Sequence, residues 1–274
     1  MSAQNSVILI IIDGLAASTA RDCMGYLQAL CDHKLASRYT LESELPSLSR
    51  PLYETLLTGT TPIESGITHN RKVRLSTQSS VFSLAQRAGL TTAAAAYHWF
   101  SELYNRAPYE AERDRFTQDP ELPIQFGCFY HLDHYPDEHL LLDADWLMST
   151  RNPDFMLIHP MNVDDAGHKF GFDSSQYRNA ARRMDGYLSQ HLPRWMEQGY
   201  QILITSDHGM NNDRSHGGTL SEERQVPLWV IGDAFTHSPA CMPRQVEVCG
   251  VVCTLLGLEN HGKPVAAEML EALQ

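Results

Sequence analysis

The feature that most constrains the fold is the apolar run Val7–Ile12, which ends at Asp13-Gly14. All of its residues except Leu9 are β-branched, which favours a central strand buried on both faces of a parallel sheet. A carboxylate directly after such a strand projects at the carboxyl edge of the sheet, where open α/β sheets bind their ligands. Asp13 is therefore the first candidate functional residue.

Strand patterns alternate with helical patterns along the rest of the chain. We expect further strands at Thr91–Ala95, Asp154–Ile158, Tyr200–Thr205 and Val226–Ile231, and helices at Ser80–Ala88, Ser175–Met196 and Val246–Leu256. This alternation predicts an α/β fold with a mainly parallel central sheet and helices on both faces. With 274 residues and 43% hydrophobic composition, the chain can bury one substantial core, so we expect a single domain over residues 1–274.

Three more acidic or histidine-bearing segments stand where strand or helix patterns end. Asp207-His208 follows one predicted strand, Asp164 and His168 are spaced to share one face of a helical turn, and His216 lies in a polar stretch between two strands. Carboxylate and neutral imidazole are ligands for zinc-like divalent metals. Each segment alone is more often a turn, a cap or a salt bridge. Their combined occurrence at pattern ends favours a metal site.

A candidate nucleophile lies in the segment from residue 46 to residue 59. Pro51 fits the first turn of a short helix that ends at Thr58-Gly59. Ser49 then lies just before the helix N-terminus, where free backbone N–H groups attract a phosphate-like anion. Metal coordination would lower the pKa of its hydroxyl and make it nucleophilic. Without the metal ligands, Ser49 or Ser47 would be an ordinary cap or turn serine.

These segments and several others resemble the alkaline phosphatase superfamily, and within it the nucleotide pyrophosphatase/phosphodiesterase branch. The similar motifs are Asp13-Gly14, Pro46-x-x-Ser49, Thr58-Gly59, Pro62-x-x-Ser65-Gly66-Ile67, Asn70, Asp164-x-x-x-His168, Asp207-His208-Gly209 and His216-Gly217. They run in family order from residue 6 to about residue 232. The tail, Val246–Leu258 followed by Gly262-Lys263-Pro264, is similar to the closing helix and Gly-x-Pro segment of the superfamily.

The resemblance implies two divalent metal ions beside a serine nucleophile. The implied ligand sets are Asp164, His168 and His216 for one ion, and Asp13, Asp207, His208 and the Ser49 oxygen for the other. It also implies a phospho-serine on Ser49 that water hydrolyses, with the Asn70 amide donating to a phosphoryl oxygen. The mixed donor set suits zinc best, although manganese or iron also fits an oxygen-rich site.

The substrate class depends on Ser49-Arg50 and Asn70. The phosphodiesterase branch usually has threonine followed by an aromatic residue, whereas this chain has Ser49-Arg50. Arg50 could bind the dianionic phosphoryl group of a monoester, while the neutral Asn70 suits a singly charged diester. We expect a hydrolase of phosphate diesters or nucleotide pyrophosphates. Two alternatives stay open: a phosphomonoesterase or phosphonate/sulfate-ester hydrolase, and a non-catalytic metal-stabilised binding protein.

Aromatic residues are concentrated between residues 97 and 138. In the resembling family an insertion here helps to cap the site, so we predict a small irregular cap. Aromatic faces could stack on a nucleobase. For most of these rings we favour a small satellite core beneath a long connection. His131 and His134 follow no strand pattern and are not predicted ligands.

The formal net charge of −12 makes a general nucleic-acid scaffold improbable, because such surfaces are usually basic. The expected partner is a small phosphate ester such as a nucleotide. The six cysteines include no Cys-x-x-Cys clip, and Cys249 and Cys253 share a helix face as buried thiols. The N-terminal run has no basic flank and is too short to span a membrane. We therefore expect a cytoplasmic protein with no membrane partner.

Overall fold

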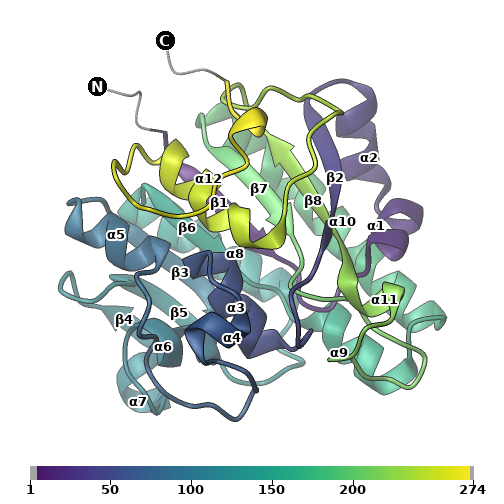
Figure 1. Ribbon diagram of the computed structural model, residues 1–274, viewed down its shortest axis with the longest axis horizontal. Helices are drawn as coiled ribbons and strands as arrows, with labels where there is room; N and C mark the ends of the chain where they lie inside the picture. Colours follow the sequence, from purple (N-terminus) through teal and green to yellow (C-terminus); the bar gives the residue numbers. More distant parts are fainter. Residues whose placement is uncertain (1–4, 272–274) are drawn as a thin grey trace.

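The structure is a computed structural model that describes residues 5–271, and its central feature is an eight-stranded sheet (Figure 1). The strands are β1 (Val7–Ile11), β2 (Ala36–Glu42), β3 (Thr92–Tyr97), β4 (Phe116–Gln118), β5 (Phe126–Tyr130), β6 (Phe155–Ile158), β7 (Gln201–Thr205) and β8 (Gln225–Ile231). Their order is β2-β8-β7-β1-β6-β3-β5-β4. The run from β7 to β5 is parallel, whereas β8 and β4 are antiparallel to β7 and β5. The predicted mainly parallel α/β sheet is confirmed.

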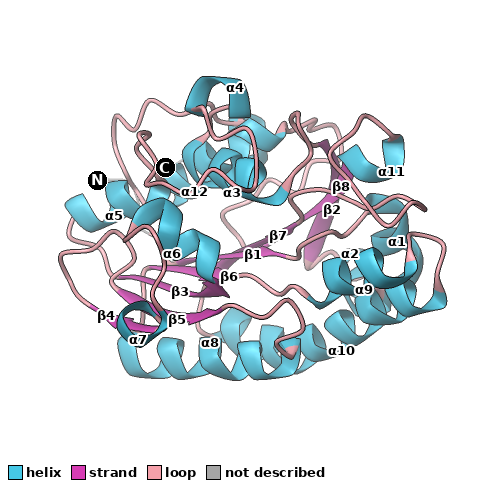
Figure 2. Cartoon of the chain, turned by 90° about the horizontal axis from the view of Figure 1, so that it is seen from below, coloured by secondary structure: helices cyan, strands magenta, loops and turns pink. Residues whose placement is uncertain are grey.

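Helices cover both faces of this sheet (Figure 2). They are α1 (Ala17–Cys23), α2 (Gly25–Asp32), α3 (Ser49–Thr58), α4 (Pro62–Ser65), α5 (Val81–Arg87), α6 (His98–Tyr104), α7 (Ala111–Asp114), α8 (Asp137–Arg151), α9 (Asn162–Phe170), α10 (Ser175–Glu197), α11 (Ser221–Arg224) and α12 (Val248–Leu255), with 3-10 turns at Gln245–Glu247 and Ala267–Met269. α8, α9 and α10 lie along one face, and α3, α5, α6 and α12 along the other. No described helix is long and apolar enough to cross a membrane.

The predicted central elements form because their side chains are buried on both sides. Every residue of β1 has zero exposure, which explains its unbroken apolar pattern. The predicted helix from Ser175 is confirmed as α10, and Ser174 caps it by accepting from the Tyr177 N–H. The helix carrying the candidate nucleophile ends at Gly59 in the left-handed conformation, as expected, but begins at Ser49 itself. Cys249 and Cys253 are fully buried free thiols in α12, also as expected.

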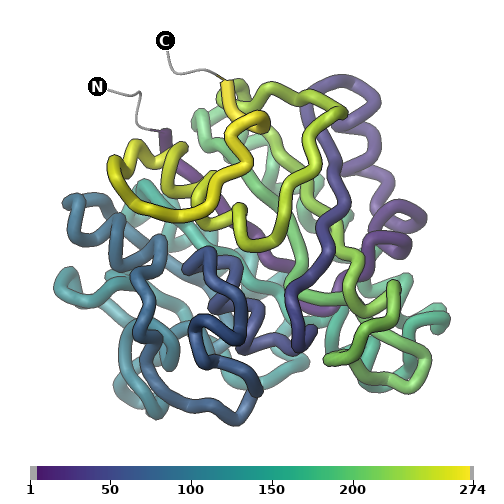
Figure 3. The backbone as a smooth tube through the Cα atoms, in the orientation of Figure 1, coloured from purple at the N-terminus to yellow at the C-terminus, as the bar shows by residue number. Residues whose placement is uncertain are grey.

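β2 is an element that the sequence patterns do not reveal. It joins the sheet beside β8 although the two are far apart in the chain, as the purple-blue and green segments of Figure 3 show. As an edge strand it keeps Thr40 and Glu42 exposed, so its apolar signal is weak. β4 and β5 are also short, and Gly127 interrupts the apolar pattern of β5.

The segment from residue 97 to residue 138 contributes α6, α7, β4 and β5 as well as loops. Phe100, Phe129 and Tyr130 are buried in the main hydrophobic core rather than in a separate satellite core. The satellite-core interpretation is therefore corrected for these rings: β5 pairs with β3 and carries Phe129 and Tyr130 into the central layer, while Phe100 belongs to α6. The cap role of this segment stays a prediction.

Candidate active site

Metal-ligand candidates from two neighbouring strands meet at the carboxyl edge of the sheet. β1 and β7 pair in parallel, with Ile11 opposite Thr205, so the residues that follow them lie together. Asp13 follows β1, while Asp207 and His208 follow β7. These three side chains are fully buried, and one ligand atom from each lies within 4.8 Å of the others. The predicted convergence of Asp13, Asp207 and His208 is present.

Gly14 allows α9 to approach this strand end closely. Its φ is +71°, and a Cβ at this position would lie only 2.8 Å from atoms of Asp164. Its N–H donates to Asp207 Oδ1 at 3.2 Å, which holds the two strand ends together. A residue with a side chain at position 14 would push Asp164 away from Asp13 and Asp207.

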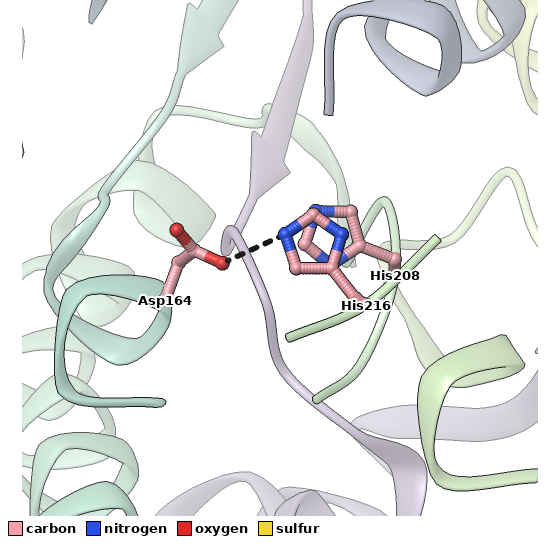
Figure 4. Close-up of side chains that lie close together, drawn as sticks. All are labelled: Asp164, His208 and His216. Atoms are coloured by element: carbon pink, nitrogen blue, oxygen red, sulfur yellow. Dashed lines mark ion pairs between the residues drawn. The ribbon is translucent and has the colours of Figure 1, made fainter. Parts of the chain in front are cut away.

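A second group of candidate ligands lies beside the first. Asp164 and His168 are one turn apart on α9, with Oδ2 and Nε2 separated by 3.4 Å. His216 comes from the loop before α11, and its Nε2 lies 3.7 Å from Asp164 Oδ1 and 3.2 Å from His168 Nε2. Figure 4 shows the Asp164 carboxylate pointing toward the overlapping rings of His208 and His216, whose centroids are 3.5 Å apart. His208 therefore lies at the junction of the two candidate metal groups.

Ser49 lies at the same junction. It is the first residue of α3, and its Oγ is 2.9 Å from His208 Nε2. The side chain is buried but faces a cavity whose wall it shares with Asp164 and His168. Ser49, Asp164, His168 and His216 thus line one hollow, while Asp13, Asp207 and His208 do not line it.

The donor atoms fit divalent cations. Asp13 Oδ1, Asp164 Oδ1 and Asp207 Oδ2 are buried and accept no hydrogen bond from the described residues, although imidazole nitrogens of His208 or His216 lie 3.1 to 3.7 Å from them. Buried carboxylate oxygens without a partner carry a large desolvation cost, whereas metal coordination satisfies them. Three carboxylates and three imidazoles form a donor set that suits zinc well.

The pKa values of these groups follow from their burial and their close packing. Burial and the charge of Asp13 raise the pKa of Asp207 well above its usual range. Burial alone would raise the pKa of Asp13, but the hydrogen bond from His159 and the nearby His208 outweigh it and lower the pKa to about 2. Burial and the neighbouring His208 lower the pKa of His216 well below 6.5, which favours the neutral imidazole that metals bind.

A supporting network around Asp13 was not anticipated from the sequence. Asp13 Oδ2 accepts hydrogen bonds from the Tyr53 hydroxyl and from His159 Nε2, the latter at 2.9 Å. Tyr130 in turn donates to the backbone oxygen of His159 at 2.6 Å. Both contacts to Asp13 use the same oxygen, so Oδ1 is left for a metal ion. His159 directly follows β6, so the strand-end signal that nominated Asp13 could also have identified it.

Arg50 and Asn70, the two predicted substrate-binding residues, occupy different positions. Asn70 lines the cavity, and its Oδ1 accepts from the Arg50 backbone N–H at 3.0 Å. The Arg50 side chain is not among the lining residues. Its guanidinium is buried behind the wall, pairs with Glu102 at 2.7 Å and lies over the Trp99 ring at 4.5 Å.

The cavity has a volume of about 260 Å³. Its lining residues are Leu48, Ser49, Asn70, Tyr97, Trp99, Asp133, Met161, Asp164, His168, Ser215 and His216. The wall also contains two aromatic rings, Tyr97 and Trp99, and the carboxylate of Asp133, which accepts from the Tyr97 hydroxyl at 2.8 Å. A larger hollow of about 610 Å³ lies along β2, but it contains none of the candidate ligands or Ser49. The smaller cavity is therefore the candidate active site.

Similarity to known proteins agrees with this site. The human GPI ethanolamine phosphate transferase 2 catalytic subunit is 24% identical over 266 residues, covering 92% of this chain and 26% of that protein. The chain thus spans about a quarter of the length of that relative. Human ectonucleotide pyrophosphatase/phosphodiesterase 5 superposes with a TM-score of 0.77 at 13% identity, covering 97% of this chain and 100% of that chain.

An inactive variant of the murine ectonucleotide pyrophosphatase/phosphodiesterase 5, solved in complex with AMP, superposes with a TM-score of 0.72 at 14% identity, covering 93% and 96% of the two chains. These structures share the fold. Residues 7–218 match the sequence family described as Type I phosphodiesterase / nucleotide pyrophosphatase, a range that includes β1 and the entire set of candidate ligands. The chain belongs to the Type I phosphodiesterase / nucleotide pyrophosphatase family, within the alkaline phosphatase superfamily.

Proposed function

We propose that this protein hydrolyses phosphate diesters or nucleotide pyrophosphates through a phospho-serine on Ser49. One observation carries the proposal: the Ser49 hydroxyl lies 2.9 Å from His208 Nε2, where the two candidate metal groups meet. A hydroxyl in this position adjoins both the cavity and the unpartnered carboxylate oxygens.

Two divalent metals, with zinc as the proposed species, complete the site. The proposed ligands are Asp164, His168 and His216 for one ion, and Asp13, Asp207, His208 and Ser49 Oγ for the other. When bound, such a pair supplies positive charge to the transferring phosphoryl group and lowers the pKa of a coordinated hydroxyl. The clusters of Asp13, Asp207 and His208 and of Asp164, His208 and His216 support this assignment, as does the neutral state favoured for His216. His168 lies outside both clusters and adjoins them through its 3.4 Å contact with Asp164.

The protein residues then perform the following steps. Ser49 Oγ forms a bond to phosphorus, the bond from phosphorus to the leaving alcohol breaks, and the alcohol departs with a proton. Water next attacks the phospho-serine, which releases a phosphate monoester and restores the Ser49 hydroxyl. Asn70, with its Oδ1 held by the Arg50 N–H, can direct its amide N–H groups at a phosphoryl oxygen.

The organic part of the substrate lies against the aromatic wall in this proposal. Tyr97 and Trp99 line the same cavity as Ser49, with ring centroids 5.1 Å apart. Aromatic faces of this kind bind nucleobases by stacking. The murine structural relative was solved with AMP, which supports a nucleotide as one substrate class.

Hydrolysis of bis-p-nitrophenyl phosphate and of p-nitrophenyl phosphate by the zinc-loaded protein tests this function. We expect faster turnover of the diester and a loss of at least about 1000-fold in the Ser49→Ala variant. Ser101→Ala is the matched control, because Ser101 is a fully buried serine on α6 whose hydroxyl has no partner. Full activity of Ser49→Ala would show that Ser49 is not the nucleophile. A wild type that turns over neither ester would favour a metal-stabilised binding protein.

A second candidate function is transfer of a phosphoethanolamine-type group to an acceptor hydroxyl. The human relative named above is a GPI ethanolamine phosphate transferase, and the cavity wall combines two aromatic rings with the exposed Asp133 carboxylate. Such a wall suits an ammonium group. In a reaction with p-nitrophenyl phosphoethanolamine and glycerol, transfer predicts a glycerol phosphodiester product. Release of phosphoethanolamine alone would support hydrolysis.

A further inference from the structure

Among the described residues, the wall of the candidate active site contains no lysine or arginine, and its basic side chains are His168 and His216. Arg50 nevertheless directly follows the candidate nucleophile. The Arg50 side chain is only 1% exposed. Its charge is therefore held close to the phosphoryl site but is not presented to it.

Glu102 on α6 is the partner that holds this charge. Arg50 Nη2 donates to Glu102 Oε2 at 2.7 Å, and Glu102 Oε1 accepts from the Tyr109 backbone N–H at 3.1 Å. The Glu102 side chain is 7% exposed. Because both carboxylate oxygens are engaged and the pair is shielded from water, the two charges cancel within the protein wall.

Arg50 also contacts two residues that line the pocket, Asn70 and Trp99. Arg50 Nε donates to the backbone oxygen of Asn70 at 2.7 Å, and the Arg50 backbone N–H donates to Asn70 Oδ1 at 3.0 Å. Its Cζ lies 4.5 Å from the centre of the Trp99 ring. The ion pair therefore supports Asn70 on the phosphoryl side and Trp99 on the side of the organic group.

We propose that Glu102 is a specificity-determining positioning residue that acts through Arg50. By cancelling the guanidinium charge behind Asn70, it disfavours the dianionic phosphoryl group of a monoester relative to the singly charged group of a diester. This inference rests on the proposed function of the site as a phosphate-ester site.

The proposal predicts a charge-specific effect of Glu102→Gln. Glutamine can still accept from Arg50 and keeps the size of the side chain, but leaves the buried guanidinium uncompensated. The uncompensated positive charge behind Asn70 favours a dianion over a monoanion, and about 1.4 kcal/mol of such a difference corresponds to a tenfold change in relative affinity. We expect the preference for diester over monoester to fall about tenfold in this variant. In the double variant Arg50→Met/Glu102→Gln, which is neutral again, the preference should return toward the wild-type value.

The experiment compares kcat/KM for bis-p-nitrophenyl phosphate and p-nitrophenyl phosphate. It is run in parallel with calorimetric binding of dimethyl phosphate and methyl phosphate to the zinc-loaded protein. Glu102→Asp, which keeps the charge, should retain the wild-type preference. Glu110→Gln is the matched control, because Glu110 pairs with the exposed Arg113 and does not contact Arg50.

An unchanged preference in a folded Glu102→Gln variant would overturn the inference, as would a double variant no closer to wild type than the single one. Thermal melting establishes folding. If Glu102→Gln does not fold, the double variant is compared directly with the wild type. A tenfold difference in diester preference between these two proteins would contradict the proposal, because the pair at positions 50 and 102 has no net charge in either. If the wild type binds both phosphates but hydrolyses no ester, the proposed function fails, and the binding preferences still test the role of Glu102.

Discussion

Replacing Tyr53 by phenylalanine tests whether the network around Asp13 prepares the metal site. Tyr53 is fully buried on α3 and donates to Asp13 Oδ2, so the change removes one hydroxyl without opening a large cavity. A hydrogen bond to a charged group contributes about 1.5–3 kcal/mol. Because the bond fixes the carboxylate that would bind the ion, its loss should weaken zinc affinity about 10- to 100-fold, as for other groups that orient metal ligands.

Zinc affinity of the Tyr53→Phe variant can be measured by competition with a chromophoric chelator. Tyr104→Phe is the matched control, because Tyr104 is also buried and its hydroxyl donates to another buried carboxylate, Glu54 Oε2, at 2.9 Å. We expect Tyr104→Phe to change stability but not zinc affinity. Equal zinc affinities for wild type and Tyr53→Phe would refute the supporting role of the tyrosine, and equal losses in both variants would point to general destabilisation.

Three further predictions concern charge, metal and substrate. Burial raises the pKa of Asp137 to about 7, so the folded state keeps the carboxyl proton up to a higher pH than the unfolded state does. The contribution of this carboxyl group to the free energy of unfolding is therefore lost as pH rises from about 4 through 7. Asp137→Asn keeps an acceptor for the Met161 and Asn162 N–H groups but has no proton to lose. Its free energy of unfolding, measured in urea, should therefore rise relative to that of the wild type by about 1.4 kcal/mol per pH unit between pH 5 and 7. Parallel pH profiles of the two proteins would contradict this. Removal of zinc with a chelator should lower the melting temperature by roughly 5–10 °C, because a ligand at about 1000 times its Kd adds about 4 kcal/mol to the free energy of unfolding. An unchanged melting temperature would argue against zinc at this site. Trp99→Ala should raise KM roughly tenfold for an aromatic diester and much less for its dimethyl analogue, and equal effects on both substrates would exclude stacking on this ring.

Much of the candidate metal site could be predicted because its residues follow the most strongly patterned elements. β1 and β7 are fully buried, so their apolar runs are unbroken and their ends are easily located. Adjacent parallel strands present their carboxyl ends at one edge, so Asp13 and Asp207 had to lie close together once the sheet was recognised. The spacing of Asp164 and His168 likewise indicated one helical face, and α9 provides it.

Apart from His159, which follows the end of β6, the residues that would orient the ligands and the substrate could not be found from local patterns. Tyr53 and His159 reach Asp13 from positions 40 and 146 residues away in the sequence, and Glu102 lies 52 residues after Arg50. Helical periodicity places Arg50 on α3 but does not show which element packs against it. Only the packing of α6 beside α3 distinguishes an arginine that contacts substrate from one that is paired behind the wall.

The position of Ser49 depends on two faces of α3, which is buried along its whole length. Ser49 and Tyr53 are one turn apart on the face toward the metal groups, where they contact His208 and Asp13.

Arg50 and Glu54 are also one turn apart, on the face toward α6, where Arg50 pairs with Glu102 and Glu54 accepts from Tyr104. A helix with two buried charged residues is tolerated because each has a partner on α6. A shift of α3 along its axis by one residue, about 1.5 Å, would break contacts on both faces at once. The periodicity of the helix thus couples the position of the candidate nucleophile to the ion pair behind the cavity wall, and the proposed effect of Glu102 would reach the reaction without contact with the substrate.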